Sequence, residues 1–224
     1  MTEITEHLQE IVERVARAGE RAGRSADSVT IVAVSKEQPA TAIATAHRAG
    51  LRHFGESYVQ QALPKMDALA GLPITWHFVG KLQANKTRQV AERFDWVHTV
   101  DRIRIAERLN EQRPQFAAPL NVLLQVNQGG ETQKGGVAEQ DVAALARAIR
   151  ELPRLKLRGL MTVPPQSGTP AEWFAALAAL RARLASEGVP LDTLSMGMSQ
   201  DFEVAIAAGA TLVRIGTAIF GRRA

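Results

Sequence analysis

Cysteine is absent from this chain of 224 residues, and aromatic residues make up only 5% of it, with a single tyrosine. Without cysteine there is no disulfide framework, no thiolate metal site and no cysteine nucleophile. The absence favours a reducing, cytoplasmic location, and it leaves lysine as the first side chain to consider for covalent chemistry. The histidines lack the spacing of metal ligands, so we expect no metal site.

Long apolar runs and a strong charge of one sign are also lacking. The longest apolar stretch, residues 204–213, is too short to span a bilayer, and the N-terminus lacks the apolar segment of a signal peptide. The formal net charge is +4, and its basic residues gather in two stretches that acidic residues interrupt. Because stacking aromatics are missing, we expect solvated helix faces there, and neither nucleic acid nor a membrane as a partner. The two stretches contain Lys81, Lys86, Arg88 and Arg93, and then Arg147, Arg150, Arg154, Lys156 and Arg158.

What the chain does have is a regular alternation of helix-like and strand-like segments. After an amphipathic helix over the first 20 or so residues, eight strand patterns follow, nearly all separated by one helix. Modules of about 25 residues favour an α/β fold, a (β/α)8 TIM barrel with an extra N-terminal helix, with an open doubly wound sheet as the alternative. No linker divides the chain, so we expect one domain over residues 1–224. The strand patterns fall at 29–34, 51–55, 74–79, 95–100, 120–126, 156–162, 191–196 and 211–215, and the later helical patterns at 40–49, 57–70, 83–93, 102–112, 138–151, 170–187 and 200–208.

Lys36 closes the first apolar strand pattern and shares a strand face with Val32 and Val34. Parallel α/β folds place their functional groups at the carboxyl ends of strands. Partial desolvation there favours the neutral amine, which a Schiff-base lysine needs. The alternative is a lysine that simply extends to solvent from a strand end.

The segments after the last two strands are rich in glycine and hydroxyl groups. In a barrel, the loops after the seventh and eighth strands are the usual phosphate site. Ser199 and Thr217 can donate hydroxyl hydrogen bonds, and Gly216 lets backbone N–H groups approach an anion. We expect a helix to begin just after Ser199, with Ser199 as its N-cap, so that its dipole also favours an anion. Ordinary turn glycines are the alternative.

Arg214 lies in an otherwise apolar final strand. A buried guanidinium needs a partner, and the simplest one is a neighbouring carboxylate. Beside a Schiff-base lysine and a phosphate site, the arginine could instead donate to the ring nitrogen of pyridoxal 5′-phosphate (PLP). Such an arginine keeps the pyridine unprotonated and weakens it as an electron sink.

Seven segments together resemble the pyridoxal phosphate homeostasis protein family, single-domain relatives of the alanine racemase barrel. The resemblance implies a PLP fold-type III barrel with PLP as a Schiff base on Lys36, the phosphate held by Ser199, Gly216 and Thr217, and Arg214 facing the pyridine nitrogen. It also implies a role in intracellular PLP and amino-acid homeostasis without an established reaction. The segments are Val32–Lys36 (VAVSK), His53–Glu56 (HFGE), Trp76–Gly80 (WHFVG), Leu82–Lys86 (LQANK), Arg158–Met161 (RGLM), Ser195–Ser199 (SMGMS) and Val213–Gly221 (VRIGTAIFG).

Two positions, Ser57 and Lys134, bear on what this resemblance implies. Ser57 stands where the family usually has asparagine, and serine cannot supply an amide to the cofactor. Lys134 matches a lysine-bearing loop of the family, where it is either a second amine for the aldehyde or a solvated loop lysine.

Three functions are compatible with these residues. The first is a non-catalytic PLP-binding protein, expected to be a monomer, with PLP-dependent apo-enzymes as recipients. The second is an amino-acid racemase or lyase of the alanine racemase-like fold. A racemase needs a base on each face of the substrate carbon, and in that family the second base is a tyrosine of a C-terminal domain, whereas Tyr58 is the only tyrosine before this chain ends at Ala224. The third is a barrel that binds another phosphorylated metabolite without using Lys36 covalently.

Overall fold

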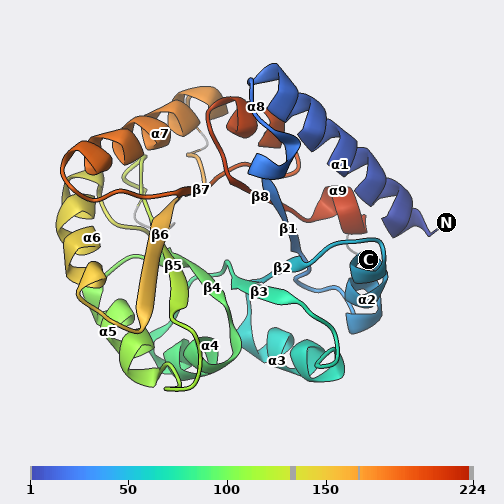
Figure 1. Cartoon of the computed structure of the whole chain (residues 1–224), viewed down its shortest axis with the longest axis horizontal. Coiled ribbons are helices and arrows are strands. Elements are labelled where there is room, and N and C mark those ends of the chain that lie inside the picture. Colours follow the sequence, from blue (N-terminus) through green and yellow to red (C-terminus); the bar gives the residue numbers. More distant parts are fainter. Residues whose placement is uncertain (1, 132–134, 166, 222–224) are drawn as a thin grey trace.

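The computed structural model describes residues 2–131, 135–165 and 167–221. Its strands are all parallel and close into one barrel in chain order, with β8 paired back to β1 (Figure 1). This closure confirms the predicted barrel and rules out the open doubly wound sheet. The strands are β1 (Thr30–Val34), β2 (His53–Glu56), β3 (Thr75–Phe78), β4 (Trp96–Val100), β5 (Leu120–Gln125), β6 (Leu155–Met161), β7 (Thr193–Ser195) and β8 (Leu212–Ile215).

Helices surround the barrel, as expected when each strand is buried on both faces. Short 3₁₀ turns precede β1, α4 and α6. The predicted boundaries agree with the observed ones to within a few residues, and the main addition is the short helix α9. The helices are α1 (Glu3–Arg21), α2 (Ala40–Arg48), α3 (Val59–Ala68), α4 (Thr87–Arg93), α5 (Ile103–Gln112), α6 (Val142–Arg150), α7 (Pro170–Ser186), α8 (Phe202–Ala207) and α9 (Thr217–Phe220).

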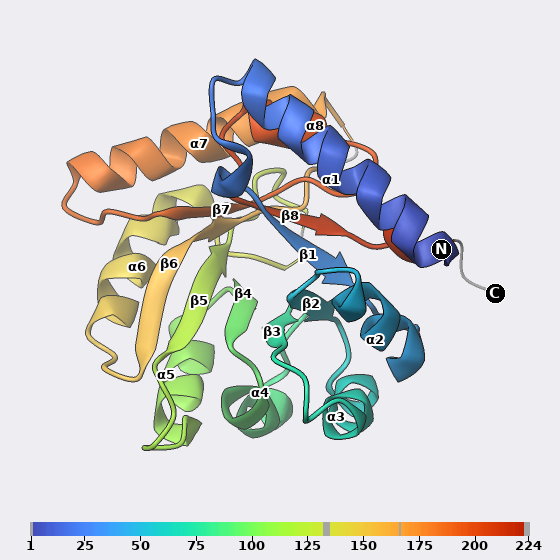
Figure 2. The ribbon, with the colours of Figure 1, turned by 45° about the vertical axis from the view of Figure 1, so that its right-hand side comes forward.

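The extra N-terminal helix α1 packs beside α8 and α9 (Figures 1 and 2). Arg14 donates to Glu203 of α8 at 3.2 Å and lies over the ring of Phe202. His7 makes a 3.3 Å hydrogen bond to the carbonyl of Ile219 in α9. Helix α1 therefore braces the two short helices that adjoin the ends of β7 and β8.

The apolar core has two parts. The larger part fills the space between the strands and the helices, as in other barrels with an outer helical ring. The smaller part lies inside the barrel and consists of Val32, Leu123, Met161 and Leu212, with Trp96 packed against it. The interior is only partly apolar, because Arg214, which pairs with Val32 in the β1–β8 register, also faces it.

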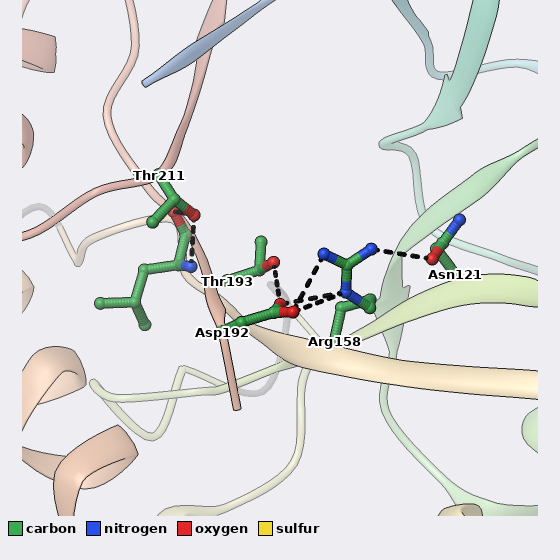
Figure 3. Close-up of polar contacts among 6 residues, drawn as sticks. Asn121, Arg158, Asp192, Thr193 and Thr211 are labelled. Carbon is green, nitrogen blue, oxygen red and sulfur yellow. Dashed lines mark hydrogen bonds and ion pairs between the residues drawn. The ribbon is translucent and has the colours of Figure 1, made fainter. Parts of the chain in front are cut away.

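Arg158 in β6 connects Asn121 in β5 with Asp192, which immediately precedes β7 (Figure 3). Its Nε donates to both oxygens of Asp192 at 3.0 Å, its Nη1 donates to Asn121 at 3.2 Å, and its guanidinium lies 5.0 Å from the Trp96 ring centroid. Burial opposes ionisation of Asp192, but the hydrogen bonds from Arg158 and Thr193 outweigh it and hold the pKa of Asp192 below its usual value.

The two basic stretches differ from the prediction in part. Arg88 and Arg93 on α4, and Arg147 and Arg150 on α6, lie on exposed helix positions as predicted. Lys156 and Arg158 lie in β6, as the strand pattern at 156–162 predicts, and not on a helix face. No helix among the described residues is long and apolar enough to cross a membrane.

Candidate functional site

A cavity of about 460 Å³ opens where β1 and β8 end, and it contains all the predicted site residues. Lys36 follows β1, Arg214 lies in β8, and Ser199 lies in the segment between β7 and α8. Residues from three separate parts of the chain thus meet at one end of the barrel, where parallel barrels carry their sites. The predicted residues that line it are Lys36, Ser199, Arg214, Gly216 and Thr217.

Lys36 is held in a tight turn that ends β1. The N–H of Gln38 donates to the carbonyl of Ser35 at 3.0 Å, which closes the turn around Lys36 and Glu37. Glu37 adopts φ 66°, a left-handed conformation that is uncommon for a residue with a side chain. Such local strain is found often beside functional groups, and here it directs the chain away from the barrel immediately after Lys36.

A buried polar cluster anchors the strand end beside Lys36. The Ser35 hydroxyl donates to Glu56 Oε1 at 2.6 Å, and Lys65 Nζ donates both to that oxygen and to the Ser35 carbonyl at 2.8 Å. Glu56 has no solvent exposure. Because a buried carboxylate is stable only when paired and hydrogen-bonded, this cluster ties β1, β2 and α3 together under the site.

Arg214 lies inside the barrel, opposite Val32 in the β1–β8 register. Its Nη1 donates to Ser195 Oγ at 2.7 Å and its Nη2 donates to the Thr162 carbonyl at 2.9 Å. None of the ion pairs found among the described residues contains Arg214, so the expected carboxylate partner is replaced by neutral acceptors. Burial lowers the pKa of Arg214 to about 10, against the opposing charge of Asp201, and the guanidinium therefore stays charged at neutral pH.

Three histidines continue this contact across the barrel interior. His98 Nδ1 lies 2.9 Å from Ser195 Oγ, His98 Nε2 lies 2.9 Å from His77 Nδ1, and His77 Nε2 lies 3.0 Å from His53 Nδ1. His77 and His98 are fully buried, whereas His53 is half-buried. A continuous hydrogen-bonded chain therefore runs from His53 through Ser195 to Arg214.

The direction of donation along these hydrogen bonds follows from the charged Arg214 at one end. Burial, together with the charge of Arg214, holds the pKa of His98 well below its usual value, and burial does the same for His77. Both rings are therefore neutral near pH 7. Arg214 can only donate, so Ser195 accepts from it, and His98 Nδ1 is the acceptor that the contacts of the described residues offer to the Ser195 hydroxyl hydrogen. Each ring then carries its hydrogen on Nε2 and donates to the next one.

Ser199, Gly216 and Thr217 lie around one edge of the cavity, but the helix predicted after Ser199 begins later. Helix α8 starts at Phe202 with Asp201 as its N-cap, so the prediction of Ser199 as an N-cap is wrong. The reason is that Asp201 closes the turn by accepting from the N–H of Met198 at 2.6 Å. Ser199 instead accepts from the N–H of Ala218 in α9 at 3.4 Å and links the two loops.

The backbone of Gly216 packs directly against the end of β1. A Cβ at this position would lie 3.2 Å from the Val34 carbonyl oxygen, which is closer than an ordinary contact. The absence of a side chain therefore lets the chain turn sharply from β8 into α9 and brings Thr217 to the cavity.

A second cavity adjoins the first and shares Lys36 and Ser57 with it. Lys81 and Lys86 also line it, although the sequence placed them on a solvated helix face. Lys81 precedes the 3₁₀ turn Ala84–Lys86, in the segment that joins β3 to α4. Lys134 lies outside the described residues, so its two interpretations stay open.

The residues behind Arg214 were not identified as part of the site from the sequence. Both ring nitrogens of the buried His77 are hydrogen-bonded. The sequence did contain a signal for this arrangement, because one histidine lies in each of three successive strands: His53 in β2, His77 in β3 and His98 in β4. Their connection to Ser195 in β7 depends on closure of the barrel.

The comparisons with known proteins show that this barrel is of the alanine racemase type. A family model described as the alanine racemase N-terminal domain matches residues 7–224. Alanine racemase of Corynebacterium glutamicum has a TM-score of 0.68 at 17% identity, over 96% of this chain and 61% of that one, and shares the fold.

Closer similarity is found with smaller proteins of this type. The pyridoxal phosphate homeostasis protein of Pseudomonas aeruginosa is 53% identical over 223 residues, covering 100% of this chain and 97% of that protein. PipY of Synechococcus elongatus, in a structure with PLP bound, has a TM-score of 0.85 at 39% identity and covers 97% of this chain and 100% of that one. The chain belongs to the pyridoxal phosphate homeostasis protein family.

Proposed function

We propose that this protein holds PLP as a Schiff base on Lys36 and serves PLP and amino-acid homeostasis without robust catalysis. The observation that carries the proposal is that Lys36 and the charged Arg214 line one cavity of about 460 Å³. Cavities of this size suit small cofactors. The PLP-bound structure of PipY supports the choice of cofactor.

The residues present fit the chemistry of PLP. Bound PLP supplies an aldehyde that condenses with amines and a pyridine ring that can accept electrons. Lys36 offers the amine, and the guanidinium of Arg214 offers a hydrogen-bond donor for the ring nitrogen. The hydroxyls of Ser199 and Thr217 and the backbone at Gly216 offer donors for the phosphate.

The state of Arg214 favours a holding role over catalysis. Because its guanidinium remains protonated near neutral pH, it donates a hydrogen bond without transferring a proton to the ring nitrogen. An unprotonated pyridine is a weak electron sink. In addition, the described residues lining the cavity of Arg214 include neither tyrosine nor histidine as a second base for racemisation, and Tyr58 lines the adjoining cavity instead.

The test is reconstitution of the purified protein with PLP. We expect a visible absorbance band that borohydride removes, with the reduced adduct mapped by mass spectrometry to Lys36. The Lys36→Ala variant should lose the band, and Lys156→Ala, at an exposed lysine of β6 that lines neither cavity, is the matched control and should keep it. A full band in Lys36→Ala would refute the site assignment.

The catalytic alternative is tested on the same material. Alanine racemisation by the holoprotein at an enzyme-like rate, above about 1 s⁻¹, would favour the racemase. A rate far below this, together with faster PLP transfer to an apo-enzyme than from free solution, would support the homeostasis role.

We further propose that the chain acts as a single-domain monomer in the cytoplasm. The closed barrel leaves no free strand edge for pairing with another chain, and the absence of cysteine suits a reducing compartment. Light scattering should give the mass of one chain, and unfolding should show one cooperative transition. Fractionation of cells should recover the protein with cytoplasmic markers.

A further inference from the structure

The second cavity, of about 450 Å³, has an uneven distribution of charge. Its described lining contains three lysines, Lys36, Lys81 and Lys86, and no carboxylate. Among the described residues, the lysine found in an ion pair is Lys65, which lies elsewhere. The cavity therefore gathers positive charge that its other described lining residues do not neutralise.

Asp101 is an acidic residue close to the second cavity, and its carboxylate already forms an ion pair with Arg102. A Cβ placed on Gly135 would lie 3.7 Å from Asp101 Oδ2 and 4.0 Å from Lys81 Cε, so both side chains approach the same glycine. The Asp101 carboxylate, however, pairs with Arg102 at 2.6 Å. An anion entering the cavity would consequently meet ammonium groups with no internal competitor among its lining residues.

The neutral lining groups suit a small polar anion. Ser57 and Tyr58 carry hydroxyls, and Gln60 and Gln83 carry amides, all of which can donate hydrogen bonds to carboxylate oxygens. Like charges close together raise the free energy of the empty cavity, and a bound anion lowers it. Because Lys36 lines both cavities, the second cavity adjoins the lysine that we propose to hold the cofactor.

We propose that the second cavity is a carboxylate-binding subsite, in which Lys81 and Lys86 hold the carboxylate of an amino acid while its amine lies near Lys36. The subsite deepens the proposed function, since it names amino acids as the amines that reach the bound cofactor. Binding of the carboxylate itself needs only the protein, so it can be tested separately from PLP loading.

The first experiment uses the apo-protein and sodium acetate at constant ionic strength. We expect the backbone amide signals of Ser57, Gly80 and Gln83 to shift with a saturable dependence on acetate concentration. Lys81→Gln and Lys86→Gln should each weaken binding about fivefold, the effect of one charge near 4 Å in water. Lys156→Gln, at an exposed lysine of β6, is the matched control and should leave it unchanged.

A parallel titration with inorganic phosphate separates the two anions. Phosphate should shift the amides of Gly216 and Thr217 in the first cavity more strongly than those of the second. Acetate shifts that are absent, or that Lys81→Gln and Lys86→Gln do not weaken, would overturn the subsite. Preferential phosphate binding at Lys81 and Lys86 would overturn its assignment to carboxylates.

The second experiment uses the PLP-loaded protein. Alanine and alaninamide are compared for the concentration that half-depletes the visible band, since only alanine carries a carboxylate. We expect the preference for alanine to fall about twentyfold in the Lys81→Gln, Lys86→Gln double variant. An unchanged preference refutes the subsite while leaving PLP binding intact, whereas acetate binding without any PLP loading would refute the proposed function instead.

Discussion

Arg214 in β8 lies directly opposite Val32 in β1, and Val32 is four residues before Lys36. The side chains of Arg214 and Lys36 both line one cavity. Two neighbouring strands therefore bring an amine and a fixed hydrogen-bond donor to the same end of the barrel. The guanidinium is held from behind by Ser195 and by the Thr162 carbonyl. Its position does not depend on a bound cofactor.

Replacement of Arg214 by Gln should weaken PLP binding without abolishing it. The charged hydrogen bond to the ring would be lost, and charged hydrogen bonds contribute about 1.5–3 kcal/mol, so we expect the dissociation constant to rise about tenfold or more. The measurement is a PLP titration followed by absorbance. Arg147→Gln, at a surface ion pair with Glu187, is the control. Equal affinity of Arg214→Gln and the wild type would contradict the proposed contact.

The histidine chain should be visible by nuclear magnetic resonance. Long-range ¹H–¹⁵N spectra of the apo-protein should show neutral His77 and His98 with hydrogen on Nε2, since Arg214 sets the direction of donation. Ser195→Ala removes the group that donates to His98 Nδ1, and we expect the tautomer population of His98 to change in that variant. A neutral His98 with hydrogen on Nδ1 in the wild type would show that the chain runs the other way.

Stability should decrease as the pH falls below the ordinary histidine pKa of 6.5. Burial lowers the pKa of His77 and His98 in the folded protein, so below pH 6.5 the unfolded chain takes up protons that the folded one does not. The stabilisation is complete above that pH and is lost at up to about 1.4 kcal/mol per pH unit for each group. His98→Asn keeps a hydrogen-bonding side chain but cannot titrate. Urea unfolding across pH 4.5 to about 7.5 should give a shallower slope for this variant, and an equal slope would argue against a neutral buried His98.

Gly80 should resist substitution because its backbone touches the loop after β2. A Cβ on Gly80 would lie 2.1 Å from the Ser57 carbonyl oxygen, so alanine must displace the segment that lines both cavities. We expect Gly80→Ala to lower stability by about 1–3 kcal/mol and to weaken PLP binding. Gly71→Ala is the matched control, since a Cβ there meets nothing within 4 Å. Comparable urea midpoints for the two variants would contradict the prediction.

Much of the fold could be predicted from sequence because its signals are local. The first strand is a short β-branched run, most helices carry their own periodicity, and the repeat length matches one βα module. The position of Lys36 at a strand end and the glycine-containing segment around Gly216 are equally local features, and the structure brings both to one cavity. The N-cap of α8 was misassigned because Asp201 competes with Ser199 for the same role two residues later.

The sequence by itself therefore determined the module pattern, the covalent candidate Lys36 and the residues expected around it. The tertiary structure decided which groups contact these residues from the barrel interior, such as Ser195 and the Thr162 carbonyl at Arg214. The hydrogen-bonded chain from His53 to Arg214 crosses from β2 to β8 and exists only because the barrel closes. The cluster of Lys36, Lys81 and Lys86 likewise depends on which loops meet at one end of the barrel. Such contacts join residues far apart in the chain, and no local pattern of residue types encodes them.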